Sequence, residues 1–92
     1  MSSYRVIVHR RIHRFLKSIK DEKRKTTLID AIEKLEDYPY SLREMDAATI
    51  RGVEKTFRVR VGRYRIVFSV DKKEKTVYVT HVNTRKRVYK KK

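Results

Sequence analysis

Residues 56–70 of the chain read TFRVRVGRYRIVFSV, and this stretch decides the fold. Phenylalanine and valine stand at alternate positions on either side of Arg58 and Arg60, which is the period of two expected of a β-strand with one covered face. The Gly-Arg pair at 62–63 is a turn signal, and YRIVFSV at 64–70 is a returning strand. The stretch therefore predicts a β-hairpin.

Upstream of the hairpin, the β-branched run YRVIV at 4–8 predicts a first strand. Apolar residues at i, i+3, i+4 and i+7 then predict a short helix, with the stripe Ile12, Phe15, Leu16 and Ile19. Asp21 is placed to cap a second helix, which should end before Pro39. The core face of that second helix is Leu28, Ile29, Ile32 and Leu35.

The stretch 39–52 has no clear period and is interpreted as a connection, anchored by Leu42, Met45 and Ile50. After the hairpin, DKKEK at 71–75 predicts a polar turn and TVYVTHV at 76–82 a fourth strand. The order β-α-α-β-β-β predicts an α+β fold in which two N-terminal helices pack on a mostly antiparallel four-stranded sheet. We expect one domain over 1–92, ending in a basic tail at 85–92.

The charge of the chain is large and unevenly distributed. Lys and Arg number 26 against 11 Asp and Glu, which gives a net charge of +15. Eight of the acids lie within residues 21–46, so the rest of the chain carries 21 bases and three acids. Such an excess favours a polyanionic partner, above all nucleic acid. The alternative is a heat-adapted surface, which would be expected to gain charges of both signs.

Composition also excludes several classes of protein. The chain has no cysteine, so disulfides and thiolate metal sites are excluded, and a reducing compartment fits. No apolar run approaches the about 20 residues of a membrane helix, and the N-terminus lacks the apolar region of a signal peptide. We therefore expect a soluble, cytoplasmic protein that does not engage a membrane.

The hairpin carries the first candidate site. Arg58 and Arg60 lie two residues apart, so their side chains share one face of the strand, and Arg65 is placed to join them from the returning strand. Like charges side by side in a sheet are destabilising, so their retention suggests that an anion binds there. The alternative is an ordinary solvated arginine face. Further candidates for RNA binding are Arg51, Lys55, Arg63, Lys86, Arg87 and Lys90.

The aromatic and histidine residues are less decisive. Arg85 and Tyr89 lie in the tail, where Tyr89 is either a stacking or phosphate-binding group or an anchor on the sheet edge. Tyr64 and Tyr78 are expected in the core or at its rim. His81 has the same strand parity as two valines, Val77 and Val79, and is expected to be partly buried and hydrogen-bonded. His9 and His13 lack a metal-binding motif. No phosphate loop, carboxylate pair, catalytic triad, metal site or cofactor site is apparent.

The stretch I50-R-G…TFRVRVGRYRIVFSV resembles the signature region of RelE-family toxins, in which an LxG element precedes strands of YRxRxG and YRxxY. The ending HVNTRKRVYK at 81–90 resembles the R-x-R-x-Y close of that family, particularly of its archaeal members. The opening strand and helix and the order of elements agree over essentially the whole chain.

The resemblance implies the toxin of a type II toxin–antitoxin system, within the RelE/ParE superfamily. It implies a metal-independent endoribonuclease that cuts messenger RNA in the ribosomal A site, with an antitoxin of RelB type as its partner. By position, the catalytic residues would be Arg58, Arg60, Arg65, Arg85 and Tyr89. Better-known bacterial members have lysines at the positions of Arg58 and Arg60, and arginine does not act as a base. Which group removes the proton is therefore open.

Two alternatives remain. A ParE-like, gyrase-inhibiting toxin shares the fold but lacks the RNase residues that this chain carries. A catalytically weak, basic RNA-binding protein would bind broadly and with a steep salt dependence.

Overall fold

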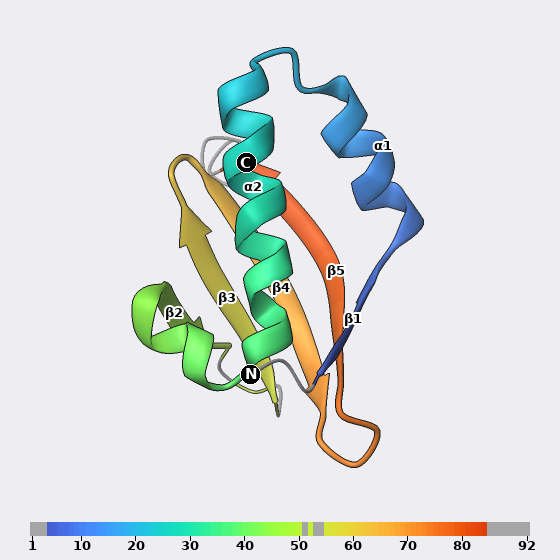
Figure 1. Cartoon of the computed structure of the whole chain (residues 1–92), viewed down its shortest axis with the longest axis vertical. Helices are drawn as coiled ribbons and strands as arrows, with labels where there is room; N and C mark the ends of the chain where they lie inside the picture. The colour runs from blue at the N-terminus through green and yellow to red at the C-terminus, as the bar shows by residue number, and fades with distance from the viewer. Residues whose placement is uncertain (1–3, 51, 53–54, 85–92) are drawn as a thin grey trace.

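The computed structural model describes residues 4–50, 52 and 55–84. Two α-helices lie on one face of a five-stranded sheet whose spatial order is β1-β5-β4-β3-β2 (Figure 1). The first strand pairs parallel with the last, and the other three pairings are antiparallel. The strands are β1 (Arg5–Val8), β2 (Asp46–Thr49), β3 (Thr56–Val61), β4 (Tyr64–Asp71) and β5 (Thr76–Thr84).

The helical layer follows the predicted pattern. The helices are α1 (Arg10–Ser18) and α2 (Glu22–Glu33), and two 3-10 turns follow them, η1 (Lys34–Asp37) and η2 (Tyr40–Glu44). The predicted cap at Asp21 is confirmed, because its carboxylate accepts hydrogen bonds from the backbone N–H groups of Lys23 and Arg24. The helix α2 lies across the sheet, and α1 lies beside it, over β5 (Figure 1).

The core lies between the helices and the inner face of the sheet. Phe68 is fully buried in β4 and stacks on Phe57 of β3, with ring centroids 5.4 Å apart. Leu28 and Ile12 cover this layer from the two helices and are also fully buried. Tyr64 is buried as expected, with its ring edge-on to Phe15. Tyr78 instead lies on the outer face of the sheet, 38% exposed.

No helix in the part of the chain described here is long and apolar enough to cross a membrane.

The predicted α+β architecture is confirmed, but the predicted number of strands is wrong. Part of the stretch 39–52, interpreted as a connection, forms η2 and the edge strand β2. This strand has the sequence DAAT, and aspartate and alanine have a low intrinsic preference for strands. Its conformation is set by pairing with β3, where Asp46 lies opposite Arg60. Leu42 and Met45 pack against the core as anticipated.

Candidate functional site

The hairpin of β3 and β4 places three arginines together on the outer face of the sheet, away from the helices. Within β3, Val59 is buried while Arg58 and Arg60 are exposed. Arg60 lies directly opposite Arg65 of β4 in the ladder. We call Arg58, Arg60 and Arg65 the arginine cluster. Its members line a hollow of about 90 Å³, together with Asp46 and Ala48 of β2.

The cluster is only partly neutralised. Arg60 donates from Nε to Asp46 Oδ2 at 3.0 Å, and both side chains stay largely exposed. The Nε atom of Arg65 is buried and has no hydrogen-bond partner among the described residues. Three guanidinium groups and one carboxylate leave an excess of positive charge in the hollow. A buried donor without an acceptor is costly, and an anion bound in the hollow would satisfy it.

Asp46 is the site residue that the sequence did not reveal. It lies in a stretch without periodicity, and its position opposite Arg60 depends on the pairing of β2 with β3. No sequence signal marks this strand, because Ala47 is half-buried and Ala48 is exposed although both are alanine. The run is also short and poor in β-formers.

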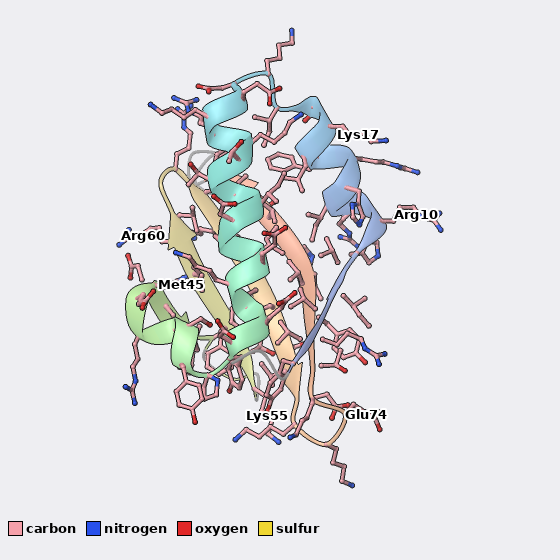
Figure 2. The ribbon with its side chains drawn as sticks, viewed as in Figure 1. Arg10, Lys17, Met45, Lys55, Arg60 and Glu74 are labelled. Atoms are coloured by element: carbon pink, nitrogen blue, oxygen red, sulfur yellow. The ribbon has the colours of Figure 1, made fainter. Side chains whose placement is uncertain are left out.

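Two other predicted basic residues, Lys55 and Arg63, do not join the cluster. Lys55 is exposed and lies at the far end of β3, near the β4–β5 turn, whereas Arg60 lies near the end of the strand toward Gly62 (Figure 2). Arg63 lies in the exposed β3–β4 turn and lines a separate cleft of about 490 Å³ against α2. The remaining predicted site residues lie outside the described residues: Arg51, Arg85, Lys86, Arg87, Tyr89 and Lys90.

His81 is hydrogen-bonded as predicted, but the prediction that it is partly buried on the face of Val77 and Val79 is wrong. The β4–β5 ladder shifts register, so that Val67 pairs with His81 but Phe68 pairs with Val79. The extra residue, Thr80, forms a β-bulge, which reverses the strand parity beyond it. His81 is therefore exposed on the outer face.

The sequence contained a signal for this bulge. The buried valines of β5 are Val77, Val79 and Val82, and their spacing changes from two to three. An uninterrupted strand keeps a spacing of two, so the change marks an inserted residue.

His81 takes part in a short chain of polar contacts. Its Nδ1 lies 3.0 Å from Thr80 Oγ1, and the Thr80 hydroxyl donates to the carbonyl of Val67 at 3.3 Å. Its Nε2 lies 3.4 Å from a guanidinium nitrogen of Arg11, at the start of α1. His9, beside it, caps α1 by accepting the backbone N–H of Arg11 at Nδ1. Within the described ranges, no three His, Cys, Asp or Glu side chains group in a way that would hold a metal ion.

Comparison with known proteins finds that the chain is similar to toxins of type II toxin–antitoxin systems. A family model described as the ParE toxin of the type II toxin–antitoxin system parDE matches residues 6–89. The RelE1 protein of Methanocaldococcus jannaschii is 24% identical over 87 residues, which are 95% of this chain and 96% of that protein.

Solved structures agree in fold over nearly the whole chain. The archaeal RelE–RelB complex from Pyrococcus horikoshii contains a chain with a TM-score of 0.78 and 26% identity, covering 95% of this chain and 99% of that one. The RelB–RelE antitoxin–toxin complex from Methanococcus jannaschii contains a chain with a TM-score of 0.70 and 25% identity, covering 90% and 94%.

Proposed function

Since the chain belongs to the ParE toxin family of type II toxin–antitoxin systems, within the RelE/ParE superfamily, we propose that it is an endoribonuclease that cuts messenger RNA on the ribosome. The observation that carries this proposal is the arginine cluster, in which the buried Nε of Arg65 lacks an acceptor. A phosphodiester supplies the anionic oxygens that such a group of guanidiniums binds.

The proposed reaction is a transesterification without metal. The ribose 2′-oxygen attacks the adjacent phosphorus, the bond to the 5′-oxygen breaks, and the products are a 2′,3′-cyclic phosphate and a 5′-hydroxyl. Negative charge accumulates on the phosphoryl oxygens as the reaction proceeds. Fixed donors aimed at that charge commonly lower the barrier by about 3–4 kcal/mol each.

The geometry supports different roles within the cluster. Arg58 and Arg65 form no ion pair within the described residues and are proposed to hold the scissile phosphate. Arg60 is held by Asp46 and would release that carboxylate in order to bind RNA. Arg85 is proposed to stabilise the leaving oxygen and Tyr89 to orient or stack on the nucleotide, on the family resemblance alone.

The proposed partners are a RelB-type antitoxin, the ribosome and messenger RNA. RelE chains of similar fold occur in complexes with RelB, as the two archaeal structures illustrate. The net charge of +15 is suited both to an acidic antitoxin segment and to ribosomal RNA.

The test is to add the purified protein to ribosomes programmed with messenger RNA, with no metal beyond what the ribosomes need, and to map the RNA ends. We expect cuts in the A site. Arg65→Ala and Tyr89→Phe should lose most cleavage and keep antitoxin binding. Arg14→Ala removes an exposed arginine of α1, away from the hollow, and should cut like the wild type. Cleavage by Arg65→Ala at the wild-type rate would refute the role given to Arg65.

A second candidate is inhibition of DNA gyrase, because the matching family model carries the ParE description. The same protein preparation is assayed for gyrase supercoiling. Inhibited supercoiling without A-site cuts would favour this second function over RNA cleavage. Tight, strongly salt-dependent RNA binding with neither activity would indicate a non-catalytic RNA-binding protein.

A further inference from the structure

We propose that His81 is the general base of the RNA cleavage described above, a role that rests on the proposed function. Removing the 2′-hydroxyl proton requires a group that accepts a proton, and the guanidiniums of Arg58 and Arg65 cannot do so. Histidine is the side chain that changes protonation near neutral pH. The bulge at Thr80 brings His81 to the same face of the sheet as the arginine cluster.

The register of the sheet determines how His81 lies relative to the cluster. Arg58, Val67 and His81 form one row across β3, β4 and β5, because Arg58 pairs with Val67 and Val67 with His81. Adjacent strands lie about 4.8 Å apart, so the backbones of Arg58 and His81 are separated by about 10 Å. Arg65 belongs to the next row on the same face.

Val67 separates Arg58 from His81 in this row. Val67 has a short, half-buried side chain, and the longer Arg58 and His81 side chains stand on either side of it. With the phosphate bound in the hollow by Arg58 and Arg65, the adjacent ribose would extend over Val67 toward His81. A general base must lie within hydrogen-bond reach of the proton that it removes, so the bound 2′-hydroxyl must reach His81 Nε2 in the RNA complex.

The contacts of His81 select a tautomer suited to this role. The hydroxyl proton of Thr80 is donated to the carbonyl of Val67, so Thr80 Oγ1 is left to accept a hydrogen bond. The His81 Nδ1 atom at 3.0 Å then carries the proton and donates it to Thr80. The lone pair is consequently on Nε2, where the contact with Arg11 is long, at 3.4 Å. Thr80 acts as a positioning residue, as a second partner commonly does for a catalytic imidazole.

The proposed step balances as follows. Nε2 of His81 takes the proton of the 2′-hydroxyl as the bond from the 2′-oxygen to phosphorus forms and the bond from phosphorus to the 5′-oxygen breaks. The 5′-oxygen takes a proton from water, and the imidazolium gives its proton to the hydroxide so formed. The charged and titratable groups around His81 are Arg11 and His9 from the start of α1, and Arg58 and Arg65 across the sheet.

The test compares His81→Gln and His81→Ala with the wild type in single-turnover cleavage of ribosome-bound messenger RNA over a series of pH values. His13→Gln is the matched control, because His13 is exposed on α1 and lies outside the row. Glutamine keeps hydrogen-bonding capacity but cannot accept the proton. We expect about 100-fold slower cleavage or worse in both His81 variants, with ribosome binding and unfolding midpoints close to those of the wild type.

The pH dependence separates catalysis from a structural role. The wild-type rate should rise with pH and then level off, because a general base acts in its deprotonated form. The His81→Gln rate should lose that rise, and added imidazole should partly restore cleavage by His81→Ala. Wild-type cleavage by His81→Gln, or an unchanged pH profile, would overturn the role of His81 while leaving the proposed function intact. Absence of cleavage by the wild-type protein would instead overturn the proposed function.

Discussion

Replacing Asp46 with asparagine removes the carboxylate that faces the arginine cluster while keeping the size of the side chain. The substitution lowers the stability of the folded protein in two ways, by the loss of an ion pair and by a repulsion that is no longer offset. The pair between Asp46 and Arg60 has side chains 63% and 46% exposed, and an ion pair of that exposure contributes about 0.2–1 kcal/mol. Arg60 also lies directly opposite Arg65, and a like-charged pair in that position costs about 0.2–1 kcal/mol once nothing offsets it.

We therefore expect Asp46→Asn to lower the free energy of unfolding by about 1 kcal/mol, which in a domain of this size lowers the melting temperature by about 4–8 °C. The loss should depend on salt. The Debye length falls from about 10 Å at 0.1 M to about 3 Å at 1 M, which is shorter than the distance of about 5 Å between Cβ atoms of opposed strand residues. The difference in free energy of unfolding between Asp46→Asn and the wild type should therefore be smaller at high salt than at low salt.

The measurement is urea unfolding at low and at high sodium chloride. Asp30→Asn serves as the control, because it makes the same change of charge at an exposed position of α2 that forms no ion pair within the described residues. If Asp46→Asn were no less stable than Asp30→Asn at low salt, or if its loss persisted unchanged at high salt, the electrostatic account of the cluster would be wrong.

Three further predictions concern the scaffold. Phe68→Ala removes a fully buried ring stacked on Phe57 and should cost about 3–5 kcal/mol in urea unfolding, with much smaller losses contradicting its central place in the core. Asp21→Ala leaves two N–H groups of α2 without their acceptor and should cost about 1 kcal/mol, most of which Asp21→Ser should recover. Burial, and secondarily Tyr4, raise the pKa of Tyr38 above its ordinary value of 10.0. The stability that the neutral Tyr38 side chain contributes is thus fully present below pH 10 and is lost as the pH rises above 10. Phenylalanine does not ionise, so the urea midpoint of Tyr38→Phe should fall less above pH 10 than that of the wild type.

The parts of the fold that depend on local periodicity were predictable from the sequence. The alternation around Arg58 and Arg60 identified the hairpin, and Gly62 at its turn adopts a φ of +60°, a conformation that glycine favours. The apolar stripe of α1 and the cap at Asp21 were likewise readable within a few residues of the sequence. Such features persist because local preference and tertiary packing agree.

The parts that depend on pairing between strands were not predictable in the same way. The edge strand β2 has little strand preference of its own and is specified by its partner β3, so Asp46 was not recognised as a neighbour of Arg60. Parity counted from Val77 and Val79 places His81 on the wrong face, because such a count does not include the bulge at Thr80. The arginines of the site lie in one hairpin of continuous sequence, whereas Asp46 is placed only by the assembled sheet and His81 only by the change in valine spacing that marks the bulge.

The bulge at Thr80 shifts the inward and outward alternation of every later residue of β5 by one position. Up to Val79, odd-numbered residues face the helices; from His81 onward the assignment is exchanged, and Val82 takes the inward position. Straightening the bulge while keeping Thr80 in the strand would therefore change more than one side chain, because it would turn Val82 toward solvent and Asn83 toward the core. A single residue with a half-buried hydroxyl thus determines which side of the sheet every later residue of the strand occupies.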